Sequence, residues 1–505
     1  MKKKPKALPP GPAVVLGTTI RPTQRQLMLT GSDLAAHKHV MGVSGAGKSK
    51  FLASLFVQLL NQGIPCAVID PHADLARDIL ALLIETSFYN DQRAFERLWY
   101  VDFSQVNEHQ AIPFNVLNQP YPPHQVASLI VEVCKRAWES GSGSTPNLEN
   151  ILLASSLALV ENGLPLSALP KLLTDADYRG QLLQRVTDSV VRDFFADRFD
   201  GYGKRASMLS ESTLRRVFLL TFSPTLRYSL GQQSNTLNFR QIMDKGISLI
   251  VNLGNLDPQT QRFLGCLLTV GFETAALSRA DSSIYGGQRS PYHLIIDEFS
   301  QFCAQSEEGL ERVLALCRKF GLTLTLAHQT FSQVSKDLQG ALQNCIHILF
   351  RLGFDDSSWA APRFMAQTPA TPAQDVRRWP WERDQAQAVS FPVSFMEGET
   401  QATWKQTFAS LERQEAIVRI GQATHLMRGL DVPPPAIDPE RLAQLEMAYT
   451  RLLFKPLGHP PALSLSQPTP NAQPETANKT NTRRRVKPPL ASNGRGDSAP
   501  PPAPE

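Results

Sequence analysis

A glycine-rich segment, Gly42 to Ser49, constrains the fold of this chain more than any other stretch. It fits the pattern G-x-x-x-x-G-K-S, in which glycines let successive backbone N–H groups turn inward toward a phosphate group. Residues 39–43 before it read as a short strand, and residues 50–60 after it carry apolar side chains at helical spacing. This order of strand, loop and helix favours a phosphate-binding loop over a chance match.

The residue types in the loop predict how ATP and Mg²⁺ would be held. Lys48 would reach the β- and γ-phosphates, and the hydroxyl of Ser49 would bind Mg²⁺. The N-terminus of the following helix would face the negative charge. The predicted nucleotide-binding residues are those of the loop and the residue after it, namely Gly42, Val43, Ser44, Gly45, Ala46, Gly47, Lys48, Ser49 and Lys50.

Short apolar runs alternate with helical patterns on both sides of a long helical stretch. Residues 66–70 and 98–102 read as strands in the first part, and the second part contains further strands at 247–253, 293–297, 322–327 and 346–352. Strands that alternate with helices predict an α/β fold, here the parallel sheet of a RecA-like P-loop NTPase. We assign this ATPase domain to residues 21–123 and 228–355.

The stretch between the two parts, residues 124–227, has helical spacing and no alternating strand pattern. These helices could be crossover connections of the sheet, but about a dozen residues suffice for a crossover. We therefore favour an inserted all-α domain, with a mobile loop at 140–146. Residues 356–400 lack a usable period, residues 415–430 read as a hairpin turning near Gly421, and the two belong to a C-terminal extension, 356–454.

Composition describes an ordinary soluble globular protein, with 42% apolar and 19% charged residues among 505. No apolar run reaches the ~18 residues of a membrane span, and the Lys-rich start does not lead into an apolar signal sequence. We therefore expect a cytoplasmic protein. Six scattered cysteines without C-x-x-C spacing predict buried free thiols.

The formal charge of +5 belongs to the ends of the chain. Residues 1–6 and 455–505 together carry +8, which leaves −3 for the rest. The basic N-terminal segment, 1–20, and the Pro-rich tail, 455–505, which we expect to be disordered, therefore say little about a basic face on the folded core.

The strand at 293–297 delivers two carboxylates, Asp297 and Glu298, at its C-terminal end. In a parallel sheet this end lies at the same edge as the phosphate-binding loop. Asp297 would then belong to the Mg²⁺ shell, and Glu298 would orient or deprotonate the attacking water. Any buried strand can end in Asp-Glu, so this inference depends on the loop being present.

Two further polar positions flank the strand at 322–327. Gln329 follows it, where an amide could sense the γ-phosphate, although an ordinary surface glutamine fits equally well. Arg318 precedes the strand at the end of a helical pattern, and by spacing alone it is better explained as a partner of the helix dipole.

The order of five segments resembles one family. G-V-S-G-A-G-K-S, I-D-P-H-A-D-L, L-I-I-D-E-F, R-K-F-G-L-T-L-T-L-A-H-Q and H-I-L-F-R-L-G follow one another as in the conjugative coupling-protein ATPases of type IV secretion, within the FtsK-HerA group of ring-forming DNA motors. The resemblance covers about residues 21–353 and includes the helical insertion. It implies a homo-hexamer with ATP between subunits and DNA, held without sequence specificity, in the central channel.

The resemblance also implies residue roles. Arg318 would extend into the nucleotide of a neighbouring subunit, Gln329 would couple hydrolysis to DNA movement, and Asp70-Pro71-His72 would lie beside the metal site. Two features depart from the family pattern: Ala73 replaces a glycine, and the N-terminal membrane helices of anchored coupling proteins are absent from this sequence.

The resulting prediction is an ATP-hydrolysing DNA translocase that acts in conjugative transfer or mobile-element mobilisation. A relaxase or secretion-channel proteins would be its partners, and it would be cytoplasmic or attached to the inner membrane through them. The alternative is a secretion-system assembly ATPase that handles protein partners. A scaffold that has lost turnover is less consistent with the intact Lys48 and Glu298.

Overall fold

The computed structural model describes residues 11–20, 23–138, 146–200, 214, 216–280, 289–303, 314, 316–365, 397–433 and 436–457. All of these belong to one unit, 1–457, with 458–505 as a second. The predictions for the basic residues 1–6 and the loop at 140–145 lie outside the described residues, as do those for most of 356–400 and nearly all of the tail.

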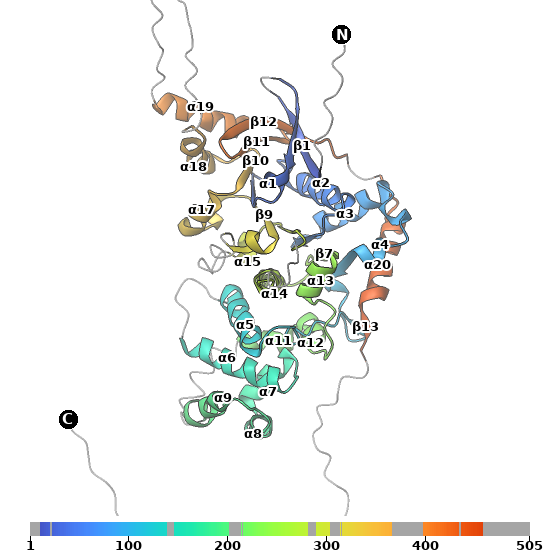
Figure 1. Ribbon diagram of the computed structural model, residues 1–505, viewed down its shortest axis with the longest axis vertical. Helices are drawn as coiled ribbons and strands as arrows, with labels where there is room; N and C mark the ends of the chain where they lie inside the picture. The colour runs from blue at the N-terminus through green and yellow to red at the C-terminus, as the bar shows by residue number, and fades with distance from the viewer. Residues whose placement is uncertain are drawn as a thin grey trace, which may run out of the picture. The chain divides into compact units, whose positions relative to one another are not determined.

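An 11-stranded sheet forms the centre of the described structure (Figure 1). Seven neighbouring strands are parallel, as predicted for a P-loop fold. Their order across the sheet is β10 (Ile346–Leu349), β3 (Lys38–Met41), β9 (Leu322–His328), β8 (Tyr292–Ile296), β4 (Cys66–Asp70), β7 (Ser248–Asn252) and β5 (Leu98–Asp102). Most of their residues are buried on both faces, which explains why they read as continuous apolar runs.

Four antiparallel strands extend the sheet beyond β10, in the order β11 (Glu415–Ile420), β12 (Ala423–Gly429), β1 (Ala13–Thr19) and β2 (Gln26–Thr30). The predicted hairpin is confirmed: β11 and β12 pair, and Gly421 supplies a left-handed turn with φ 58°. Sequence analysis did not predict β1 and β2. Gly17 of β1 is required there because a Cβ would come within 2.2 Å of the Arg428 carbonyl oxygen.

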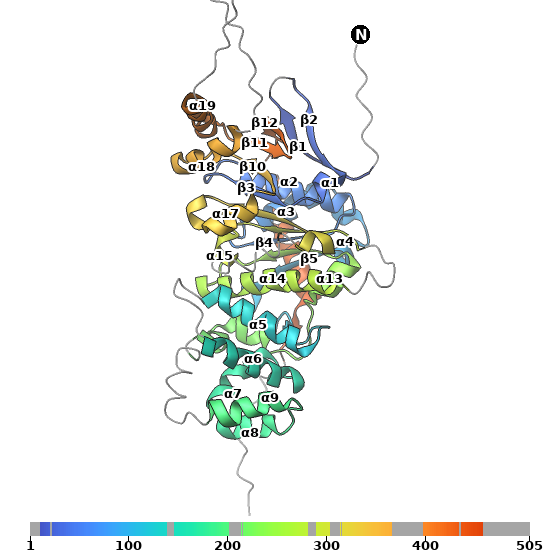
Figure 2. The ribbon, with the colours of Figure 1, turned by 60° about the vertical axis from the view of Figure 1, so that its left-hand side comes forward.

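Helices cover both faces of the parallel strands (Figure 2). α2 (Lys48–Asn61) and α3 (Asp74–Glu85) lie on one face, and α13 (Phe239–Lys245) and α14 (Pro258–Ser278) lie on the other. Local sequence sets the ends of these helices. Asp257 caps α14 by accepting a hydrogen bond from the Thr260 amide at 3.0 Å, and Gly246 ends α13 with φ 67°.

Residues 123–230 are helical where they are described, and none of these described residues adds a strand to the large sheet. The helices are α5 (Pro123–Trp138), α6 (Pro146–Glu161), α7 (Leu169–Thr174), α8 (Ala176–Leu183), α9 (Ser189–Asp193), α11 (Leu219–Phe222) and α12 (Pro224–Leu230). α5 packs against α14, where Arg136 forms two buried hydrogen bonds with Glu273 at 2.9 and 2.8 Å. The helical character agrees with the sequence, whereas the division into domains stays a prediction.

Four further helices lie near β10 and β5, the outermost strands of the parallel part of the sheet. α17 (Lys336–Leu342), α18 (Phe354–Met365) and α19 (Glu397–Ser410) lie near β10, and α20 (Pro439–Leu453) lies near β5 (Figure 1). The sequence has no usable period across residues 356–400, yet α18 covers the first part of this range. No described helix is long and apolar enough to cross a bilayer. Cys66, Cys134, Cys266, Cys317 and Cys345 are buried free thiols, as predicted.

Candidate active site

The glycine-rich loop connects β3 to α2 and depends on three glycines. Gly45 and Gly47 have φ values of 75° and 115°, which other residues rarely adopt. Gly42 has no room for a side chain, because a Cβ there would lie 2.7 Å from the Cβ of Phe350. The conformation and packing of the loop therefore require glycine at these three positions, while its binding of phosphate stays a prediction.

Neighbouring backbone holds the loop in place. The Val43 amide donates to the Arg351 carbonyl at 2.9 Å, and the Gln414 amide donates to the Ala46 carbonyl at 2.9 Å. The Cα of Gln414 would also lie 3.2 Å from a Cβ at Gly47. Sequence analysis could not identify Gln414, since its contact comes from strand pairing across several hundred residues.

Lys48 lies at the first position of α2 and is 7% exposed. Its Nζ donates to the Gly42 carbonyl at 2.6 Å and lies 3.4 Å from the Val43 carbonyl. Burial lowers the pKa of Lys48, while the nearby Glu298 and Asp297 raise it. The lysine therefore lies within electrostatic range of both predicted acids.

The side chains of the next two residues, Ser49 and Lys50, have different surroundings. Ser49 is exposed at the start of α2, where its hydroxyl is accessible to a metal ion. Lys50 forms an ion pair with Asp78 of α3, with 3.0 Å between Nζ and Oδ2. The side chain of Lys50, one of the predicted nucleotide-binding residues, is therefore paired with α3.

Asp70, Asp297 and Glu298 form a buried acidic group at the C-terminal ends of β4 and β8. Burial, together with the neighbouring Glu298 and Asp70, raises the pKa of Asp297 to about 6. The carboxylate of Asp70 accepts hydrogen bonds from the amides of His72 and Ala76, both at 2.8 Å, at the start of α3. The buried carboxyl groups of Asp297 and Glu298 lie beside Lys48. They fit a divalent cation, which would offset their charge.

Gln329 lies directly against Glu298. Its Nε2 donates to Glu298 Oε1 at 2.8 Å. This contact follows from the sheet order, because β9 lies between β3 and β8 and Gln329 is the residue after β9. Glu298 has a left-handed φ of 46°, a conformation that costs free energy in a non-glycine residue and is often retained at functional sites.

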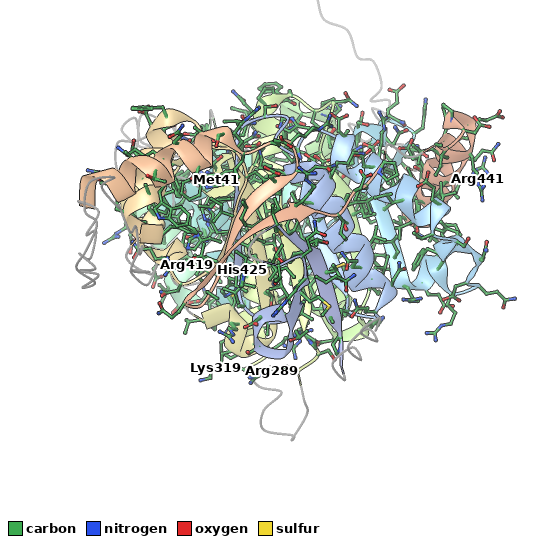
Figure 3. All side chains as sticks on the ribbon, turned by 90° about the horizontal axis from the view of Figure 1, so that it is seen from above. Met41, Arg289, Lys319, Arg419, His425 and Arg441 are labelled. Carbon is green, nitrogen blue, oxygen red and sulfur yellow. The ribbon has the colours of Figure 1, made fainter. Side chains whose placement is uncertain are left out.

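Arg318 is the predicted site residue that the structure does not bring to the loop. It is exposed in a short helix, Cys317–Phe320, that precedes β9. The seven residues of β9 separate it from Gln329 by roughly 20 Å. The adjacent Lys319 lies next to Arg289 at the edge of the molecule (Figure 3), and its carbonyl accepts a hydrogen bond from Arg289 at 3.0 Å.

Three histidines form a buried chain under the loop. His39 of β3 lies between His347 of β10 and His328 of β9, with ring nitrogens 3.0 and 2.7 Å apart, respectively. His328 Nδ1 lies 2.9 Å from the carbonyl oxygen of Thr330. Burial lowers the pKa of His328 and of His347 to about 4. Sequence analysis missed this chain because each histidine stands alone in its strand.

No family model matches the sequence, and no curated protein matches it either. Solved structures do share its fold. The plasmid coupling protein TrwB in complex with the non-hydrolysable GTP analogue GDPNP has a TM-score of 0.54 at 15% identity, covering 86% of this chain and 98% of that chain. TrwB in complex with ADP and Mg²⁺ has a TM-score of 0.52 at 14% identity, covering 81% and 88%.

VirB4 of Thermoanaerobacter pseudethanolicus is similar as well, with a TM-score of 0.50 at 14% identity, covering 83% of this chain and 96% of that chain. At these identities the comparisons establish the fold alone. That fold is the one the sequence motifs predicted.

Proposed function

We propose that this chain, which has the fold of the coupling protein TrwB and of VirB4, is a Mg²⁺-dependent ATPase. The observation that carries the proposal is the hydrogen bond between Gln329 and Glu298 beside Lys48. It brings together Glu298 after β8, Gln329 after β9, and the lysine of the loop after β3, the next strand beyond β9. If these charged residues served only to stabilise the fold, an exposed glycine-rich loop would not be required at the same ends of the strands.

The side chains divide the work of hydrolysis. The loop amides and Lys48 would bind and orient the triphosphate, and Ser49 and Asp297 would hold Mg²⁺, which supplies positive charge to the β- and γ-phosphates when bound. Glu298 would orient the attacking water and accept its proton. Gln329 fixes the Glu298 carboxylate, so a change at the γ-phosphate can be passed to β9.

The finer proposal is a DNA translocase that works as a homo-hexamer in conjugative transfer or mobile-element mobilisation. Two observations support it. The fold is that of a plasmid coupling protein. Arg318 is exposed before the N-terminal end of β9, whereas the glycine-rich loop of the same subunit lies at the C-terminal ends of the strands. An arginine in that place cannot serve its own nucleotide but can serve that of a neighbouring subunit in a ring. A cytoplasmic location, with inner-membrane contact through partners, stays a prediction.

The alternative, an assembly ATPase with protein partners, is favoured by the charge distribution. The basic excess lies at the two ends of the chain, and the rest has a net charge of −3. A core without a basic excess is less suited to holding DNA phosphates.

ATP hydrolysis with and without single- or double-stranded DNA tests both proposals. The translocase predicts stimulation by DNA and loss of hydrolysis in Lys48→Ala. Hydrolysis that disappears in Lys48→Ala but ignores DNA would favour the assembly ATPase, and hydrolysis retained in Lys48→Ala would refute the site itself.

Mixed rings test the role of Arg318. Arg318→Ala and Lys48→Ala subunits should each be inactive alone. In mixtures, an Arg318→Ala subunit keeps its own loop and can receive Arg318 from its Lys48→Ala neighbour, so activity should return. Absence of activity at every mixing ratio would contradict action in trans, and native mass spectrometry of the same mixtures reports the ring size.

A further inference from the structure

A polar cavity lies away from the glycine-rich loop, between β10, β11 and α18. Its volume is about 320 Å³, and two arginines, a histidine and two aromatic rings line it: Arg363, Arg419, His347, Trp359 and Phe364. His347 and Arg419 stand opposite each other in the pairing of β10 with β11. His347 also belongs to the buried histidine chain, whereas the other lining residues lie outside the candidate active site.

The two arginines give the cavity a positive charge that no described carboxylate neutralises. Arg363 lies over the ring of Trp359, with 3.9 Å from Cζ to the ring centroid, and donates to the Trp359 carbonyl at 2.8 Å. Arg419 lies over the ring of Phe364 at 5.8 Å, and it donates to the carbonyls of Gly421 and Arg363 at 3.3 and 3.5 Å.

Each guanidinium has five N–H donors, so most of them have no protein acceptor within the described residues. Burial lowers the pKa of both arginines. Both side chains are only partly buried, so their remaining N–H groups are open to water or to an anion in the cavity. The forked geometry of the guanidinium suits the oxygens of a phosphate group.

The aromatic side adds a second recognition element. The indole Nε1 of Trp359 is buried and has no hydrogen-bond partner among the described residues. The ring itself is held against Phe331, with 3.6 Å between centroids, so its orientation is fixed. Phe331 and Arg363 cover the two faces of the ring, so a ligand in the cavity meets the edge of Trp359 beside the arginines. The volume is at the small end of the roughly 300–1,000 Å³ typical of ligand sites, which suits a single unit.

We propose that this cavity binds one nucleotide unit, with its phosphate at Arg363 and Arg419 and its base at the edge of Trp359. The unit could come from a free mononucleotide or from a single strand, because both present the same phosphate and base. The proposal does not depend on hydrolysis at Lys48, so either can fail without the other.

Binding to the full-length Lys48→Ala protein tests the proposal without turnover. The probes are dTMP, inorganic phosphate and fluorescein-labelled oligo(dT), measured by calorimetry or fluorescence anisotropy at low salt. The double variant Arg363→Gln/Arg419→Gln should weaken binding of dTMP or oligo(dT) at least tenfold. Arg428→Gln is the matched control, since Arg428 lies on the same hairpin but pairs with Glu412 and Glu415.

The outcomes separate the sources. A loss confined to dTMP assigns the cavity to free nucleotides, and a loss confined to oligo(dT) assigns it to a strand. Binding of inorganic phosphate without either nucleotide probe would overturn the role of the rings. An unchanged affinity in the double variant, or an equal loss in Arg428→Gln, would overturn the site.

Trp359→Phe tests whether misfolding explains a loss of nucleotide binding. It keeps a ring but removes the unpartnered N–H, and it should weaken nucleotide binding less than the double variant does. Circular dichroism of each variant must match the parent protein, and the conservative pair Arg363→Lys/Arg419→Lys should bind with intermediate affinity, because it keeps the charge but not the fork.

Discussion

Replacing Asp297 by asparagine should stabilise the protein while it abolishes hydrolysis. Asp297 is 6% exposed, and its surroundings raise its pKa from the ordinary 3.8 to about 6. The folded state therefore holds its proton at a pH where the unfolded state has lost it, so stability falls as pH rises from about 4 to about 6. A shift of about two pKa units corresponds to about 3 kcal/mol at pH 7.5, which the neutral asparagine would recover.

Thermal and urea unfolding in EDTA at pH 7.5 and at pH 4.5 measure this effect. At about 2 cal/mol/K per residue, 3 kcal/mol corresponds to a rise in Tm of about 3 °C for a unit of this size. At pH 4.5 the wild-type carboxyl group is mostly protonated, so the difference between the proteins should shrink. Asp193→Asn on the exposed face of α9 is the control. A variant no more stable than wild type at pH 7.5, or equally stabilised at both pH values, would refute the reasoning.

Three other substitutions test separate parts of the structure. Gly42→Ala would place a methyl group 2.7 Å from a side-chain carbon of Phe350, so ATP binding, followed by a fluorescent analogue, should weaken at least tenfold; Gly340→Ala, with nothing within 4 Å, should leave it unchanged. Gln329→Glu would set a second carboxylate against Glu298, so kcat should fall more than tenfold while the Kd for ATP changes little. Equal changes in kcat and in the Kd for ATP would contradict the role of Gln329 in positioning Glu298. Arg136→Met would leave Glu273 buried without its partner, so urea unfolding should report a loss of about 3–5 kcal/mol. Arg136→Met/Glu273→Leu should lose less, and a single variant as stable as wild type would contradict the ion pair.

The sequence was sufficient for the parts of the site that lie on one stretch of chain. β4 and β5 were predicted at their observed bounds, since both are buried parallel strands with continuous apolar runs. The loop glycines and the Asp297-Glu298 pair were also selected from local pattern and strand order, and their roles stay predictions.

Contacts that depend on strand pairing could not be predicted in this way. The support of the loop by Gln414 exists because β11 pairs with β10 beside β3. β1 was missed because only some of its residues are buried, so its apolar pattern is weak. α18 was missed because Pro362 interrupts a short segment of mixed polarity. In each case tertiary context decided the structure.

The chain of His347, His39 and His328 has too few protons for its contacts. Its outer nitrogens face the carbonyls of Gln343 and Thr330, and each of these contacts requires an N–H. If both outer histidines spend their single proton there, neutral His39 can donate toward β9 or toward β10 but not toward both. Burial lowers the pKa of His39 well below its usual value, which keeps a second proton off the ring. The strand that carries the glycine-rich loop is thus bonded through this ring to one neighbour at a time, and exchanging the tautomer exchanges the neighbour.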